Sequence, residues 1–247
     1  DFIASLTNCS NLRILSLSGN KLGGNVPKIM ANLSNQLIEL LLGGNQLSGS
    51  IPEGFGNFVN LYRLGLELNS LSGIIPRDFG KLQNLQGLRL DENGFSGQIV
   101  FPLCNATTLY YLDLSFNHFE GGNIFDNVLM NCQNLQYLDI SRNNFTGIIS
   151  PHFLRTHSSL MYMKMGENSF GGSLPPEVGK LKNLVDFVVS RNQFSGDIPI
   201  SFADCKNLEN LYMQANFFQG TIPPNLASLK SIQQLDLSSN NLTGPIP

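Results

Sequence analysis

The side chains that could perform acid–base, nucleophilic or metal chemistry are few and poorly spaced for it. The histidines, His118, His152 and His157, form neither an HExxH motif nor a metal-ligand spacing with the cysteines. The sequence also lacks a GxSxG elbow, a phosphate-binding loop and the kinase motifs. Adjacent carboxylates occur at Asp91 and Glu92, where solvation explains them better than catalysis does. We therefore expect no catalytic residue, no metal and no cofactor in this sequence.

Aromatic and charged side chains of the kind that recognise ligands do recur at a nearly constant spacing. Tyr111, Tyr137 and Tyr162 are separated by 26 and 25 residues, and Arg63 and Asp186 occupy corresponding positions nearby. Tyrosine is rigid and amphipathic, and tyrosines bordered by charges are typical of recognition sites. The meaning of the spacing depends on the elements that carry these residues.

The spacing comes from an internal repeat that runs through all 247 residues. Leu-x-x-Leu-x-Leu-x-x-Asn occurs in ten copies that begin 24 to 26 residues apart, at Leu12, Leu37, Leu61, Leu85, Leu109, Leu135, Leu160, Leu184, Leu208 and Ile232. The alternation of Leu with exposed residues predicts one half-buried strand per copy. Repeats of this length and pattern predict a leucine-rich-repeat fold of α/β type. This is a right-handed solenoid with a parallel concave sheet and a mostly irregular or 3-10 convex side.

The second half of each repeat predicts how the chain returns to the next strand. An Asn ends every strand motif and is expected to bond turn backbone and link neighbouring coils, at Asn20, Asn45, Asn69, Asn93, Asn117, Asn143, Asn168, Asn192, Asn216 and Asn240. A Gly and an Ile-Pro pair follow in copies such as "LSGSIP" (47–52). Three residues after the Pro position an apolar side chain is expected to fill the core, at Phe55, Phe79, Leu103, Phe153, Val178, Phe202 and Leu226.

The repeat is irregular in the middle and at both ends. The repeat that contains residues 119–134 is two residues longer than the template and lacks the Ile-Pro pair, and "IIS" (148–150) replaces that pair in the next copy. Residues 1–11 resemble the back half of a repeat, and the sequence stops within another. Because solenoids need polar caps, we expect residues 1–247 to be a single solenoid segment of a longer chain, uncapped at both ends.

Composition limits the kinds of partner. Only 13% of residues are charged, the net charge is −3, and no block of basic residues occurs. Nucleic-acid binding is therefore not expected, because it usually relies on a clustered basic face. No apolar run approaches the roughly 18 residues that a membrane span requires, so this segment itself is not expected to contact a membrane.

Cysteines and glycosylation sequons bear on the compartment. Cys9, Cys132 and Cys205 share one apolar position of the repeat, so we expect them, together with Cys104, to be free thiols in the core. Cys104 and Cys132 occupy neighbouring coils, which leaves pairing of these two open. Asn-x-Ser/Thr acceptors favour a glycosylated, secreted or cell-surface chain, and they occur at Asn8, Asn32, Asn105, Asn144 and Asn241.

Strands stacked in register place the third, fifth and seventh residues of each repeat on the concave sheet, with the second and eighth at its margins. Asp113, Asp139 and Asp236 belong to the recurring "LDLS" pattern and are assigned to the strand edge or to solvation. The candidate ligand-binding residues depart from that pattern: Arg63, Glu67, Arg89, Asp91, Tyr111, Phe116, Tyr137, Arg142, Tyr162, Lys164, Asp186 and Tyr212, with Glu92, Glu167 and Arg191 as further charges at the margins. The alternatives are that these residues only keep the sheet solvated and laterally paired, or that they pair with another protein.

The return segments resemble a known class of repeat. "LSGSIP", "LSGIIP", "FSGDIP" and "LTGPIP" resemble the plant-specific leucine-rich repeat. "LTNCSNLRILSLSGNKLGG" and "LDLSSNNLTGPIP" are similar to the ectodomains of plant receptor kinases, within the subfamily of immune receptors that detect bacterial patterns.

This resemblance implies a cell-surface receptor with one transmembrane helix and an intracellular Ser/Thr kinase, both outside these residues. It implies a peptide or protein ligand on the inner surface and a co-receptor kinase with leucine-rich repeats near the C-terminal coils. Kinase-less receptor-like proteins and inhibitors of wall-degrading enzymes, secreted to the cell wall, share the repeat and remain alternatives. A third alternative is homotypic assembly through stacked ends.

Overall fold

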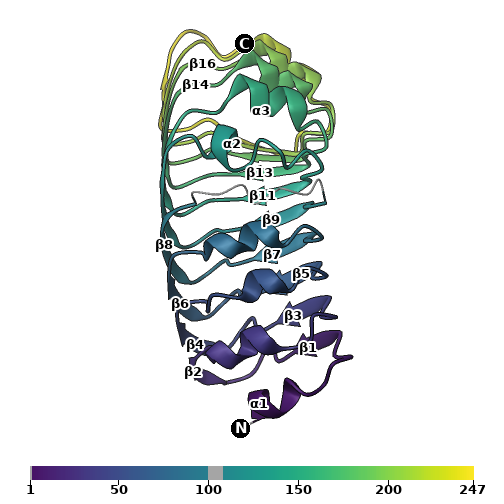
Figure 1. The fold of residues 1–247 in the computed structure, drawn as a ribbon. Helices are drawn as coiled ribbons and strands as arrows, with labels where there is room; N and C mark the ends of the chain where they lie inside the picture. Colours follow the sequence, from purple (N-terminus) through teal and green to yellow (C-terminus); the bar gives the residue numbers. More distant parts are fainter. Residues whose placement is uncertain (1, 100–107) are drawn as a thin grey trace.

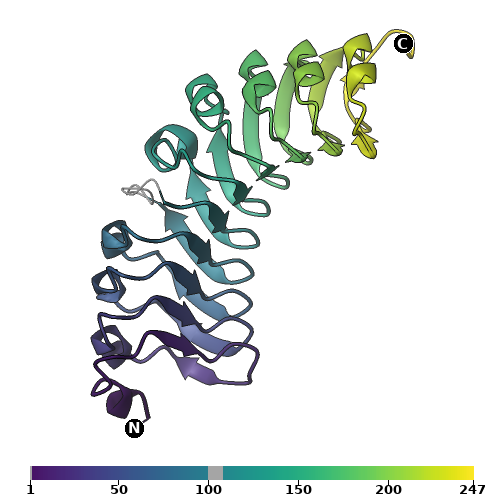
Figure 2. The same cartoon turned by 90° about the vertical axis from the view of Figure 1, so that its right-hand side faces the viewer.

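The computed structural model describes residues 2–99 and 108–247. Each repeat forms one coil, and the coils stack in chain order from the purple N-terminal end to the yellow C-terminal end (Figure 1). The stack bends into an arc whose outer side carries the short helices (Figure 2). The predicted fold class, a leucine-rich-repeat solenoid, is confirmed.

The Leu-x-Leu motifs form the first sheet. Its ten parallel strands lie in chain order: β1 (Ile14–Ser16), β3 (Glu39–Leu41), β5 (Arg63–Gly65), β7 (Gly87–Arg89), β9 (Tyr111–Asp113), β11 (Tyr137–Asp139), β13 (Tyr162–Lys164), β15 (Asp186–Val188), β17 (Asn210–Tyr212) and β19 (Gln234–Asp236). In each strand from β3 to β17 the middle residue is buried, and at least one of its two neighbours faces outward. We call this outward side of the first sheet the concave face.

A second ten-stranded parallel sheet runs beside the first and was not predicted. It consists of β2 (Gly23–Asn25), β4 (Gln46–Gly49), β6 (Ser70–Gly73), β8 (Gly94–Gln98), β10 (His118–Gly121), β12 (Asn144–Gly147), β14 (Ser169–Ser173), β16 (Gln193–Asp197), β18 (Phe217–Gly220) and β20 (Asn241–Leu242). Its strands follow the strand-ending Asn of each coil. A Gly with positive φ, such as Gly49 (φ 76°), lets the backbone bend away at the end of the strand.

The convex side carries short helices, nine of them within the described residues. The 3-10 helices are η1 (Lys28–Asn32), η2 (Phe55–Asn57), η3 (Arg77–Lys81), η4 (Pro176–Lys180), η5 (Ile200–Asp204) and η6 (Pro224–Ser228), and the α-helices are α1 (Phe2–Leu6), α2 (Ile124–Asn127) and α3 (Pro151–Thr156). The irregular middle repeats are those that form α2 and α3. In "IIS", Ser150 caps α3 by accepting a bond from the Phe153 N–H, and Pro151 occupies the first helical position.

The predicted asparagine ladder and core side chains are confirmed. The Asn117 amide donates to the Leu90 carbonyl of the preceding coil at 2.9 Å and to Leu114 of its own coil at 3.2 Å, while its oxygen accepts from the Phe95 N–H at 2.9 Å. The same inter-coil pattern recurs from Asn45 to Asn240. The predicted core residues Phe55, Phe79, Phe153, Val178, Phe202 and Leu226 are all buried, and Leu103 lies outside the described residues.

The expectation of four buried free thiols is wrong for two of the cysteines. Cys132 is disulfide-bonded, and Cys9 is a free thiol that is exposed. Cys205 is buried and free, as expected, and Cys104 lies outside the described residues. None of the helices in the described part of the chain has the length and apolar character to cross a bilayer.

Candidate functional site

The in-register strands of the first sheet bring the three tyrosines into one row. Tyr111, Tyr137 and Tyr162 are direct register partners on β9, β11 and β13. The rings of Tyr111 and Tyr137 stack at 4.3 Å with only 3° between their planes, and those of Tyr137 and Tyr162 lie 5.7 Å apart at 44°. We call these residues the tyrosine row. All three tyrosines are partly exposed, and the Tyr137 hydroxyl donates to Asp139 at 3.5 Å, so the row is a preformed amphipathic surface.

Two carboxylates lie beside the tyrosine row on the same strands. Asp113 and Asp139 are register partners, and each accepts hydrogen bonds from the backbone N–H and the hydroxyl of the serine two residues later. This confirms their assignment to the strand edge. Burial raises the pKa of Asp113 to about 6, against the opposing hydrogen bonds from Ser115. Burial also raises the pKa of Tyr137, and the negative charge of Asp113 adds to that shift.

Charged residues flank the row on its C-terminal side. The Lys164 ammonium lies 5.4 Å from the centre of the Tyr137 ring and 3.9 Å from the Asp186 carboxylate. Asp186 also accepts from the Asn210 amide at 2.6 Å. Tyr212 lies further along the sheet, where its hydroxyl bonds Gln234. Lys164 and Asp186 are thus part of one surface with the row.

A second group of candidates lies at the margin of the first sheet. The Arg142 guanidinium lies 4.4 Å from the centre of the Phe116 ring and 2.9 Å from the Glu167 carboxylate. All three residues immediately precede a ladder asparagine, and their backbones are left-handed, with φ of 52–55°. Glu92 and Arg191 have the same conformation. This conformation turns the side chains outward at the strand end.

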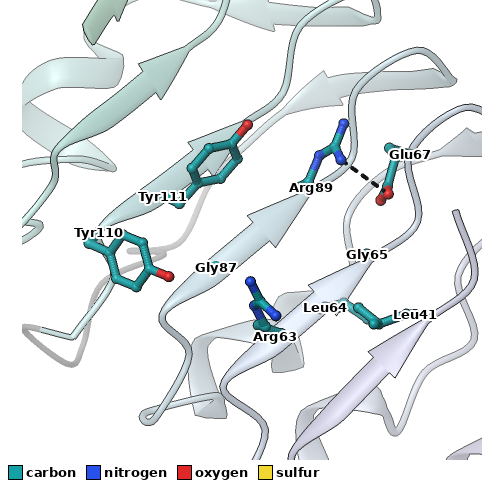
Figure 3. Close-up of a pocket in the computed structure, with 9 residues that line it drawn as sticks. All are labelled: Leu41, Arg63, Leu64, Gly65, Glu67, Gly87, Arg89, Tyr110 and Tyr111. Atoms are coloured by element: carbon teal, nitrogen blue, oxygen red, sulfur yellow. Dashed lines mark hydrogen bonds and ion pairs between the residues drawn. The ribbon is translucent and has the colours of Figure 1, made fainter. Parts of the chain in front are cut away.

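A hollow of about 400 Å³ lies on the N-terminal side of the row. It is lined by Leu41, Arg63, Leu64, Gly65, Glu67, Gly87, Arg89, Tyr110 and Tyr111 (Figure 3). We call it the Gly87 hollow. Arg89 spans its end, 3.3 Å from the Glu67 carboxylate and 3.1 Å from Asp91. Arg63 forms a looser pair with Glu39 at 3.8 Å.

The geometry thus gathers the twelve candidates into three groups and leaves one apart. The first group surrounds the Gly87 hollow and consists of Arg63, Glu67, Arg89, Asp91 and Tyr111. The second is the tyrosine row with its flanking charges: Tyr111, Tyr137, Tyr162, Lys164 and Asp186. The third, at the sheet margin, is Phe116 with Arg142, and the residue left apart is Tyr212. Sequence reasoning missed five residues that line the hollow: Leu41, Leu64, Gly65, Gly87 and Tyr110. The sequence did contain a signal for the hollow: Gly65 occupies the same repeat position as Arg89, and Gly87 the same position as Tyr111, so two large side chains are missing from neighbouring coils.

The four sequons within the described residues lie outside the strands of the first sheet. Asn8 precedes the first strand, Asn32 ends η1 on the convex side, and Asn144 and Asn241 begin β12 and β20 of the second sheet. All four side chains are exposed, and Asn105 lies outside the described residues. A glycan at these positions would leave the tyrosine row and the Gly87 hollow uncovered. Within the described residues, no group of three or more His, Cys, Asp or Glu could hold a metal ion.

Comparison with known proteins agrees with this architecture. The Leucine Rich Repeat family matches residues 11–33, 36–58, 134–155, 207–229 and 231–247. These five stretches lie within the repeat array, whose fold is a leucine-rich-repeat solenoid. A putative receptor-like protein kinase of Arabidopsis thaliana is 58% identical over 64 residues, which cover 26% of this chain and 6% of the kinase.

Two solved receptor structures match nearly the whole chain. The TDR receptor is 30% identical with a TM-score of 0.89 over 99% of this chain and 42% of the receptor chain. The Arabidopsis receptor kinase HAESA, in complex with the peptide hormone IDA and the co-receptor SERK1, is 30% identical with a TM-score of 0.80 over 99% of this chain and 44% of that chain. The matches confirm the resemblance to plant leucine-rich-repeat receptor kinases, and this chain spans less than half of each.

Proposed function

We propose that the concave face binds a peptide or protein ligand, and that the chain is a ligand-recognition segment of a plant cell-surface receptor kinase. The observation that carries the proposal is the tyrosine row with its flanking charges. A stacked pair of half-buried rings needs little ordering when a ligand binds, so the entropic cost of binding is low. Side chains with this chemistry are favoured at the centres of protein–protein interfaces.

The relatives support the wider setting of this proposal. HAESA is described with both a peptide hormone and a co-receptor, and its structure superposes on almost all of this chain. By analogy, the parent protein carries an intracellular kinase outside these residues, faces the cell exterior with its repeats, and pairs with a repeat-containing co-receptor. Glycosylation at the exposed sequons fits an extracellular location.

The proposal is tested by selecting a random dodecapeptide display library on this chain. The selected peptides are then titrated against the chain and against a variant in which Tyr111, Tyr137 and Tyr162 are changed to Ala together. Saturable binding that falls at least tenfold in the triple variant supports recognition on the concave face. A fall of this size corresponds to about 1.4 kcal/mol of lost binding energy.

The matched control is Phe217→Ala, which removes an exposed aromatic ring from the second sheet. Peptide binding should survive this change. Circular dichroism and the melting temperature check that the triple variant remains folded. Binding that is equal in the triple variant, or that is lost in Phe217→Ala, would contradict recognition by the tyrosine row.

A further inference from the structure

The Gly87 hollow interrupts a column of side chains that is otherwise filled. The third position of successive coils carries Glu39, Arg63, Gly87, Tyr111, Tyr137 and Tyr162, each the register partner of the next. Neighbouring strands lie about 4.8 Å apart, which is close to the 4.3 Å at which Tyr111 and Tyr137 stack. Gly87 is thus one strand spacing from the Tyr111 position and one from the Arg63 position.

The backbone at this gap does not require glycine. Gly87 lies within β7, and its φ is not positive. A Cβ built on it would meet only the Cγ of Arg63, at 3.8 Å, which is an ordinary contact. Gly65, which also lines the hollow, differs because a Cβ there would lie 2.9 Å from the Glu67 carboxylate. Gly87 therefore leaves open space that packing within the chain does not need.

The walls of this space suit one kind of occupant. One face of the Tyr111 ring is covered by Tyr137, so its other face is directed toward the gap. The opposite wall is Arg63, whose side chain is 54% exposed and held only by its distant ion pair with Glu39. Arg89 closes one end, where its guanidinium pairs with Glu67 (Figure 3). Asp91 holds the same guanidinium at 3.1 Å. A flat aromatic ring placed here would stack on Tyr111 and receive a cation–π contact from arginine.

We propose that the Gly87 hollow is a slot for an aromatic side chain of the bound peptide or protein, inserted between Tyr111 and Arg63 as the missing member of the column. This inference rests on the proposed function, because it assigns a specific contact to the recognition surface. The slot supplies a selectivity that the tyrosine row alone lacks. A leucine side chain fills volume but has no π-face for either wall.

The first test uses N-acetyltryptophanamide as the probe and needs no knowledge of the natural ligand. Its binding to the chain is followed by saturation-transfer NMR, beside N-acetylleucinamide. We expect saturable binding of the aromatic amide with a Kd on the order of 1 mM, and binding of the leucine amide at least tenfold weaker. Equal binding of the two amides, or no binding of the aromatic one, would overturn the slot.

The second test fills the slot from within the chain. The sequence contains no Trp, so Gly87→Trp introduces a single fluorescent reporter. We expect blue-shifted emission, protection from iodide quenching, and at least a tenfold loss of N-acetyltryptophanamide binding. Asn210→Trp is the matched control, since it adds a ring to the same column on β17 away from the hollow. It should keep probe binding. If the Gly87→Trp variant binds the probe as tightly as the Asn210→Trp variant does, the proposal is overturned.

The two proposals fail in different ways. If random dodecapeptides bind through the tyrosine row but the aromatic amide does not bind, recognition stands and the slot is wrong. If the amide binds and Gly87→Trp blocks it while no peptide binds, the slot stands and peptide recognition is wrong.

Discussion

Two aromatic columns run along this solenoid, one inside it and one on its concave face. The inner column consists of Phe95, Phe119, Phe145, Phe170, Phe194 and Phe218, which stack at 6.1 to 6.4 Å and are almost completely buried. The outer column is the third-position column of the first sheet, in which the tyrosine row spans only three coils, has unequal ring spacings and adjoins Gly87.

The contrast separates side chains that hold the coils together from side chains that are free to serve recognition. Every member of the inner column fills the same space in its coil, so a gap there would leave a cavity. A gap in the outer column opens only to solvent. The concave face can therefore vary from coil to coil, with Arg, Gly, Tyr and Asp in one column, at little cost to the fold.

The largest expected effect is the loss of a ring from the inner column. Phe145→Ala should lower the free energy of unfolding by about 3–5 kcal/mol, because it leaves a cavity between Phe119 and Phe170. Tyr137→Ala should cost only about 1–2 kcal/mol, because the Tyr137 side chain is partly exposed rather than enclosed in the core. Urea unfolding of the two variants measures the difference. Equal losses would show that the tyrosine row is structural.

The next effect concerns the bonds that hold the inner column in place. Asn117→Ala would leave the buried Phe95 N–H without its side-chain acceptor and remove one of the two amide donors to each of the Leu90 and Leu114 carbonyls, at a cost of about 2–4 kcal/mol. Asn20→Ala is the control, because its exposed amide bonds only its own coil. It should cost less than about 1 kcal/mol. Similar melting temperatures for both variants would contradict a stabilising inter-coil ladder.

A smaller effect comes from the carboxylate beside the tyrosine row. Because burial raises the pKa of Asp113 to about 6, the folded state holds its proton more tightly than the unfolded chain, whose ordinary pKa is about 3.9. Stability should therefore rise as the pH falls from above 6 toward 4. Asp113→Asn should stabilise the chain by about 1–3 kcal/mol at pH 8 and reduce this rise, leaving the part that comes from Asp139, whose pKa burial also raises.

Urea unfolding across this pH range measures the effect. The control is Asp236→Asn. Asp236 forms the same aspartate–serine bond in the last coil, but its side chain is only half-buried, so this substitution should not be stabilising. A pH profile that is the same in Asp113→Asn and the unsubstituted chain would contradict the assignment.

The sequence predicted the features that depend on one coil repeating another. The strands of the first sheet, the asparagine ladder and the tyrosine row follow from the period alone, because in-register stacking places equal positions side by side. The second sheet was missed because its strands, such as Ser70–Gly73, are rich in Ser and Gly, which have low strand propensity. Its inner phenylalanines stand two residues after successive ladder asparagines, a signal that the sequence did contain.

Other features depend on distances that a period does not give. The Cys132 disulfide requires a specific separation of two side chains, so register alone left pairing open. The Gly87 hollow is an absence of side chain, and its meaning depends on what stands on either side. In the sequence, Gly65 and Gly87 look alike. The structure shows that only Gly65 is needed to make room for Glu67.

That difference gives the smallest and most specific prediction. Gly87→Ala should raise the free energy of unfolding by about 0.5–1 kcal/mol, because alanine in a strand loses less backbone entropy on folding and meets no close atom. Gly65→Ala should lower it by up to about 1 kcal/mol, since the new methyl displaces the Glu67 carboxylate from its 3.3 Å contact with Arg89. Thermal unfolding of the pair decides the sign. If both substitutions shift the melting temperature in the same direction, Gly65 and Gly87 do not differ in the way proposed, with Gly65 required for packing and Gly87 leaving the outer column open.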